Sequence, residues 1–177
     1  MQRGLYEQRK NQFENANTFL NNAQQIQKRS YQIRHALAKN EMAWGVYELK
    51  NQYFGSAAYH YEKGEEKFLE LINSPDYSKA LGYSVHSYVN LKIDYYTLAS
   101  DVLSDEEIGD MYGYLIQTAT ADYKVMQQAV QKVYEYCMAK GIKKDVTEKF
   151  EKENFWQCKK AYEHREGINF VRDYMIM

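Results

Sequence analysis

The stretch WGVYELKNQYFGSAAYHYEKG (residues 44–64) has the pattern of two helices that cross at small side chains. Ala57 lies twelve residues after Gly45, Tyr61 follows four residues later, and Gly64 three residues beyond that. At these spacings Gly45 and Ala57 meet across a helical hairpin, and large aromatic side chains fill the space around the crossing. The stretch therefore predicts a close antiparallel pair of helices.

The hairpin is expected to occupy residues 40–72, with its turn at residues 53–55. It opens a helical domain that we assign to residues 40–177. Every segment of the chain has helical spacing, and no run alternates apolar and polar residues with the period of a strand. The predicted fold is all-α, an antiparallel helical array or bundle with a long N-terminal helix.

Residues 5–44 contain neither glycine nor proline, and their apolar or small side chains recur at spacings of three and four. This pattern is typical of an amphipathic helix. We assign residues 1–39 to one long helix, which either projects, packs on another subunit or breaks near Lys28–Ser30. Because its apolar stripe is too long for a small domain to cover completely, we expect a partner helix or a second copy of the chain to cover it. The alternative is that the helix folds back over the hairpin and over the helix predicted at residues 105–140. The candidate partner-binding residues are Phe13, Phe19, Leu20 and Ile26.

Helix boundaries farther along the chain follow from capping signals. Pro75 follows a boundary and is expected to start a helix that reaches about Ser100, with an interruption near residues 92–94. Ser104 and Glu107 have the spacing of a capping box. It opens a predicted helix of about 35 residues, which closes at a C-terminal glycine, Gly141. A last helix is predicted from residue 145 to residue 166, followed by an apolar tail.

Composition excludes several classes of protein. The chain has 177 residues, with 23 basic and 24 acidic side chains and a formal charge of −1. This balance lacks the positive charge expected of a nucleic-acid binder, and no segment predicts a membrane span or a signal peptide. Two cysteines, Cys137 and Cys158, do not make a disulfide framework, so we expect reduced thiols and a cytoplasmic protein. Eighteen tyrosines are either core packing or an aromatic-rich binding surface.

The hairpin pattern resembles the tetratricopeptide repeat, although Glu41 and Glu48 stand where that repeat usually has large aromatic residues. Residues 45–103 are further similar to the repeat region of the Rap family of bacterial regulators. The similar segments are GVYEL (45–49), AAYHYEK (57–63), EEKF (65–68) and DYSKA (76–80). Rap proteins have several later repeats that form a peptide pocket, and these have no counterpart here. The resemblance implies a binding scaffold and assigns no individual binding residue.

Few residues suggest catalysis or metal binding. The four histidines and two cysteines show neither the spacing of a helix-borne metal site nor a Cys-x-x-Cys motif, so we expect no metal and no cofactor. Arg29 and His35, six residues apart, fit the loose pattern of the helical HEPN ribonucleases. The resemblance implies that dimerisation brings two such pairs together, and that the arginine steadies a phosphate while the histidine acts as the acid–base or nucleophile-activating group. The alternative is that His35 is a partly buried helix residue.

We therefore expect a non-catalytic helical scaffold that binds a protein or peptide partner, with a regulatory role. The first alternative is a structural subunit of an oligomeric assembly, such as a phage particle component, which would place the protein in a virion. The second is a HEPN-like ribonuclease. We expect the scaffold to bind neither nucleic acid nor a membrane. The sequence leaves open whether the chain forms a homo-oligomer.

Overall fold

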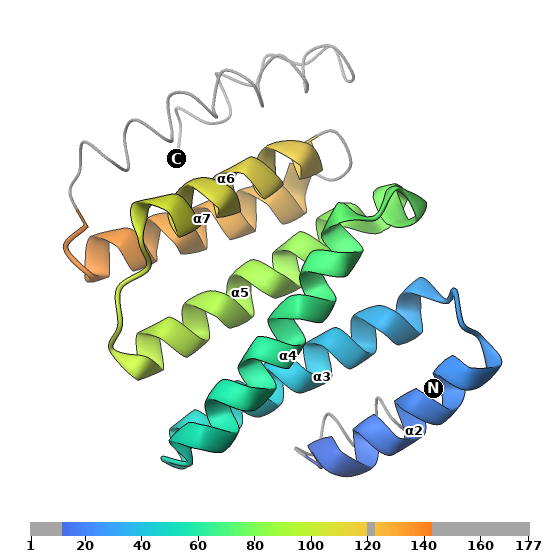
Figure 1. Cartoon of the computed structure of the whole chain (residues 1–177). Coiled ribbons are helices and arrows are strands. Elements are labelled where there is room, and N and C mark those ends of the chain that lie inside the picture. Colours follow the sequence, from blue (N-terminus) through green and yellow to red (C-terminus); the bar gives the residue numbers. More distant parts are fainter. Residues whose placement is uncertain (1–11, 120–122, 143–177) are drawn as a thin grey trace.

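The computed structural model describes residues 12–119 and 123–142, and every regular element in these residues is helical (Figure 1). In chain order the elements are α2 (Phe13–Ile26), α3 (Tyr31–Lys50), α4 (Phe54–Asn73), the short 3-10 helix η1 (Pro75–Ala80), α5 (Leu81–Ala99), α6 (Asp105–Ala119) and α7 (Tyr123–Ala139). The prediction of an all-α fold is confirmed.

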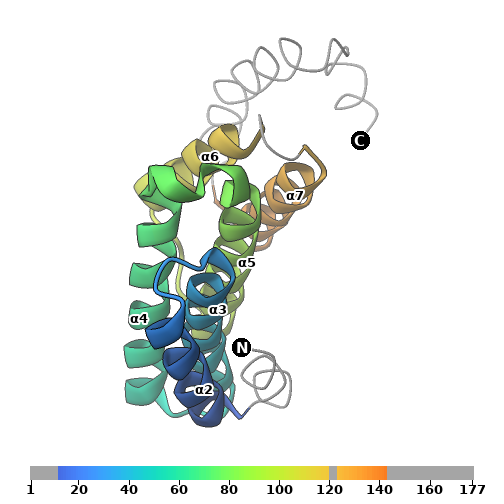
Figure 2. The same cartoon turned by 90° about the vertical axis from the view of Figure 1, so that its right-hand side faces the viewer.

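Consecutive helices run antiparallel, so α3, α5 and α7 point the same way and lie side by side in one layer (Figure 1). The Tyr31 hydroxyl of α3 lies 2.9 Å from the Ser84 hydroxyl of α5, and Lys132 of α7 forms an ion pair with Asp94 of α5 at 2.8 Å. Helices α4 and α6 cover one side of this layer, as Figure 2 shows. The described residues thus form a two-layered helical array. Helix α2 packs on α3, at the N-terminal end of this array.

The α3–α4 hairpin crosses at small residues, as the spacing predicts. Ala57 is fully buried, and a Cβ added to Gly45 would lie 2.8 Å from the Ala57 carbonyl oxygen. The turn, however, lies at residues 51–53 and not at 53–55. Gln52 adopts the left-handed conformation (φ 65°), and the Tyr53 amide donates to the Glu48 carbonyl at 3.0 Å. Because Gln52 closes α3 in this way, no glycine is needed there, and Gly55 belongs to α4.

The long helix assigned to residues 1–39 is instead two helices in the described part of the chain. Helix α2 ends at Ile26 and α3 begins at Tyr31, so a boundary after residue 39 falls inside α3. The chain reverses at residues 27–30, near the break considered from the sequence. Folding back removes Leu20 from water against Ile33 and Leu37 of α3, which a straight helix would leave exposed.

The predicted 35-residue helix is also wrong, because α6 ends at residue 119 and α7 starts at residue 123. Its two ends are as predicted. Ser104 and Glu107 exchange the two hydrogen bonds of a capping box, at 2.8 and 3.2 Å. Gly141 has a φ of 66° and closes α7. One straight helix would leave an apolar face uncovered, whereas the reversal buries Leu115 and Met126 in a common core.

Helix α5 is continuous from Leu81 to Ala99, so the interruption expected at residues 92–94 is absent from it. The predicted helix over residues 145–166 and the apolar tail lie outside the described residues. None of the described helices has the length and apolar character that a membrane span requires.

Candidate functional site

The four candidate partner-binding residues have different environments. Phe13 and Leu20 are buried within the chain itself, and Phe19 is half-buried. Ile26, at the end of α2, is 84% exposed. The apolar stripe is therefore largely covered by α3, and only Ile26 at the C-terminal end of α2 is fully exposed.

An open groove lies at the other end of α2, where its first turn meets the last two turns of α3. Its volume is about 340 Å³. We call it the aromatic groove, and it is lined by Gln12, Phe13, Glu14, Asn15, Trp44, Tyr47 and Glu48. It contains Phe13, one of the residues singled out from the sequence.

Three aromatic residues, Phe13, Trp44 and Tyr47, are among those that line the aromatic groove. Phe13 stacks on Trp44 with ring centroids 5.9 Å apart, and its ring lies 5.5 Å from that of Tyr47. Trp44 also stacks on His60 of α4 at 3.6 Å. The indole Nε1–H of Trp44 donates to Glu48 Oε1 at 3.1 Å, which orients this carboxylate at the edge of the groove.

A buried polar network beneath the aromatic groove ties α2, α3 and α4 together. The Glu41 carboxylate accepts from Asn17 Nδ2 at 2.7 Å and lies 2.7 Å from His60 Nδ1. The Asn40 side-chain amide donates to the Phe13 carbonyl at 2.9 Å and to Asn17 Oδ1 at 2.8 Å. These bonds fix the first turn of α2 and the ring that stacks on Trp44, so the groove is built before any ligand arrives.

A second buried cluster joins α4, α5 and α6. Lys92 is 6% exposed, and its ammonium lies 2.8 Å from Glu65 Oε1 and 3.3 Å from Glu107 Oε1. The Tyr88 hydroxyl donates to the same Glu65 oxygen at 2.8 Å, and the Tyr96 hydroxyl donates to Glu107 at 3.1 Å. Burial raises the pKa of both tyrosines, so they remain hydrogen-bond donors at neutral pH. The cluster joins three helices, and Glu65 also lines an open hollow of about 480 Å³ on the surface of α4, together with Glu62, Glu66, Leu69, Glu70 and Asn73.

Within one copy of the chain, the two residues of the ribonuclease pattern have separate environments. Arg29 is exposed in the turn before α3, where its carbonyl accepts from the Tyr77 hydroxyl at 3.3 Å. His35 stacks on Tyr31, and its Nε2 lies 3.1 Å from the Ser87 hydroxyl. Burial and the nearby Lys39 lower the pKa of His35 to about 4, so its ring is neutral at pH 7. This placement matches the alternative of a partly buried helix residue.

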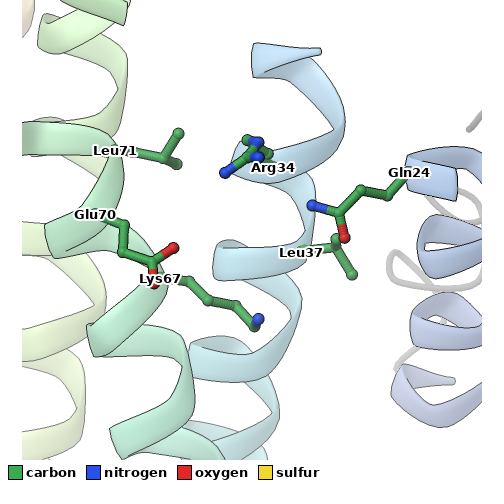
Figure 3. A pocket seen from close by; sticks show the side chains of 6 residues that line it. All are labelled: Gln24, Arg34, Leu37, Lys67, Glu70 and Leu71. Carbon is green, nitrogen blue, oxygen red and sulfur yellow. The ribbon is translucent and has the colours of Figure 1, made fainter. Parts of the chain in front are cut away.

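A small hollow between α2, α3 and α4 holds about 30 Å³ (Figure 3). It is lined by Gln24, Arg34, Leu37, Lys67, Glu70 and Leu71. A space of this size accommodates a water molecule or two and no organic ligand. Within the described ranges, no three His, Cys, Asp or Glu side chains are grouped as a metal site requires. Cys137 is buried in the core, and Cys158 lies outside the described residues, so the expected state of this pair stays a prediction.

Comparison of the chain with protein-family models, with curated proteins and with solved structures gave no match. The resemblance to tetratricopeptide repeats and to Rap proteins therefore stays a prediction from the sequence, and so does the role that it implies. The aromatic groove differs from the larger hollow on α4 in its lining, because three aromatic residues line the groove and none lines that hollow.

The sequence singled out Phe13 as a candidate and placed Trp44 at the start of the hairpin pattern, but it did not bring the two together into a groove. The signal was present at Glu41 and Glu48, the two positions where the repeat pattern has aromatic residues and this chain has carboxylates. Glu41 belongs to the buried network and Glu48 to the rim of the aromatic groove. The partners of Glu41 lie 24 and 19 residues away in the chain, so local spacing does not reveal them.

Proposed function

We propose that this protein is a non-catalytic scaffold whose helical array binds a segment of a protein or peptide partner at the aromatic groove. The observation that supports this function is the groove itself, an open hollow with a volume of about 340 Å³ that three aromatic residues help to line. Aromatic residues provide large contact areas and dominate the energetics of many protein interfaces.

The rigidity of the groove favours binding. The Trp44 ring of α3 is held in place by its stack on His60 of α4 at 3.6 Å and by its hydrogen bond to Glu48 on its own helix. A side chain that is already fixed loses little conformational entropy when a partner binds, so more of the contact energy appears as affinity. The groove also lies where α2 and α3 meet, and sites built on helices hold their geometry better than sites built on loops.

Affinity capture from the native host tests this proposal, with two variants compared side by side. Tyr47→Ser removes a 40% exposed ring that lines the groove. Tyr83→Ser removes a 58% exposed ring on α5 that does not line it, and serves as the matched control. We expect a partner retained by the wild type and by Tyr83→Ser to be lost with Tyr47→Ser. Equal retention by both variants would contradict the assignment of the groove.

The alternative of a structural subunit in an oligomeric assembly rests on Ile26, which is 84% exposed at the end of α2. An apolar side chain this exposed is ordinary on its own, but an assembly interface would cover it. Sedimentation velocity distinguishes the two functions, because an assembly subunit forms large closed particles that Ile26→Ser disrupts. A monomer or dimer unaffected by that substitution favours the scaffold.

A further inference from the structure

We propose that the aromatic groove takes a cationic side chain, lysine or arginine, from the partner segment. This inference rests on the proposed binding function and adds the chemistry of the residue that is recognised. It follows from the charges and rings that line the groove at the junction of α2 and α3.

Two carboxylates and no base line the groove in the described residues. Glu14 extends from the first turn of α2, and Glu48 from the last turns of α3. The remaining polar residues of the lining, Gln12 and Asn15, are neutral amides that can accept hydrogen bonds from an ammonium or guanidinium group. A cation entering the groove thus meets negative charge and acceptors without like-charge repulsion.

Among the described residues, only one oxygen of the Glu48 carboxylate accepts a hydrogen bond from another side chain. Its Oε1 accepts the Trp44 indole N–H at 3.1 Å, which holds the carboxylate plane in place. Oε2 is then positioned for a hydrogen bond to a cationic donor, and charge-assisted bonds of this kind are stronger than neutral ones.

The ring of Tyr47 supplies the second attraction. It is 40% exposed and sits beside Phe13 in the wall of the groove. A cation within about 6 Å of an aromatic face is attracted by the ring quadrupole. This chain uses the same contact elsewhere, where Lys63 lies 4.7 Å above the ring of Tyr59 and Lys92 lies 5.6 Å from that of Tyr88.

The size of the groove fits a side chain with its flanking backbone. About 340 Å³ is at the lower end of the range for small-ligand pockets, roughly 300–1,000 Å³, and is too small for a packed helix. The lining combines two carboxylates with the 40% exposed ring of Tyr47. An aliphatic stem lying over Tyr47 with its charged end at Glu48 matches this combination.

The probes for the test are blocked tripeptides, acetyl-Gly-Arg-Gly-amide and its citrulline analogue, which has nearly the same shape and no charge. Binding is measured by NMR from the Trp44 indole N–H, which lies beside the groove. We expect a saturable shift with the arginine peptide, an affinity at least tenfold lower with citrulline, and weaker binding at high salt. Equal affinity for the two peptides, or tighter binding of the norleucine analogue, would overturn the proposal.

Two variants locate the effect. Glu48→Gln keeps the shape of the side chain and an oxygen for the Trp44 bond, and we expect it to reduce arginine-peptide affinity at least tenfold. Glu62→Gln, an exposed glutamate of α4 outside the groove, is the matched control and should leave affinity unchanged. Unchanged affinity in Glu48→Gln would exclude the groove as the cation site.

The same variants separate this inference from the proposed function. If Tyr47→Ser loses the captured partner while Glu48→Gln retains it and the arginine peptide does not compete, the scaffold function stands and the cationic ligand is refuted. If the arginine peptide binds at Glu48 but capture is independent of Tyr47, the cation site stands and the scaffold function at this groove is refuted.

Discussion

Gly45 of α3 lies so close to Tyr61 of α4 that a Cβ at residue 45 would come within 2.7 Å of the Tyr61 backbone nitrogen. A second glycine, Gly64, approaches the backbone of Met42 at least as closely. One glycine lies on each helix of the hairpin, and the two close contacts bring the backbones of α3 and α4 together at two points along its length. This approach places the Trp44 ring beside His60 and thereby shapes the aromatic groove.

Gly45→Ala is expected to destabilise the protein, because the added methyl group meets backbone atoms that cannot rotate away. Overpacking of this kind costs about 1–3 kcal/mol. Gly113→Ala in α6 is the matched control, since nothing lies within 4 Å of its added Cβ. Alanine there should raise the free energy of unfolding by up to about 1 kcal/mol through helix propensity. Urea unfolding measures the free energy of unfolding of both variants. A similar change in this free energy for the two variants would contradict the close crossing of α3 and α4.

Lys92→Met is expected to destabilise the protein strongly, because it leaves Glu65 and Glu107 partly buried without their cation. Losing one partner of a buried ion pair costs on the order of 3 kcal/mol. Lys132→Met, which removes the more exposed ion pair with Asp94, should cost less than about 1 kcal/mol. The free energy of unfolding from denaturant titration measures both effects. Adding Glu65→Gln to Lys92→Met should recover part of the loss, and a double variant that is less stable still would refute this account.

Phe13→Ser is expected to release α2 from the array, because Phe13 is buried between Trp44 and Tyr47. Truncating a buried aromatic side chain costs about 3–5 kcal/mol. Ile26→Ser on the same helix removes a side chain that is 84% exposed and should change stability by less than about 0.5 kcal/mol. Hydrogen exchange of the α2 amides distinguishes the two variants. Equal protection of α2 in both would mean that Phe13 does not anchor the helix.

Local signals predicted the parts of the fold that local contacts determine. The Gly45–Ala57 spacing gave the hairpin, and Ser104 with Glu107 gave the start of α6, because a crossing or a cap involves residues close in sequence. The sequence between α2 and α3, and between α6 and α7, contains no glycine or proline to mark a change of direction. There the burial of apolar side chains such as Leu20 and Leu115 against distant helices decides the path.

The candidate site was less predictable for the same reason. Phe13 and Trp44 are 31 residues apart, and their stacking depends on the reversal after Ile26, which was only one of three alternatives for this segment in the sequence. The departure of Glu41 and Glu48 from the repeat pattern was visible, but its meaning depends on Asn17 and other residues of distant segments. A carboxylate where packing favours an aromatic ring is a useful sign of a polar network.

Acid is expected to weaken the fold through His35, whose pKa burial and Lys39 lower to about 4. In an unfolded chain the pKa of histidine is about 6.5. Between these two pKa values the unfolded state binds a proton that the folded state does not. The contribution of neutral His35 to the free energy of unfolding is therefore complete above pH 6.5 and declines as the pH falls. At pH 4 the loss approaches roughly 3 kcal/mol. His35→Gln removes the proton-binding group, so urea midpoints at pH 7.0 and 4.5 should differ less in the variant than in the wild type. Parallel pH dependence in the two proteins would show that His35 is not held neutral by its surroundings.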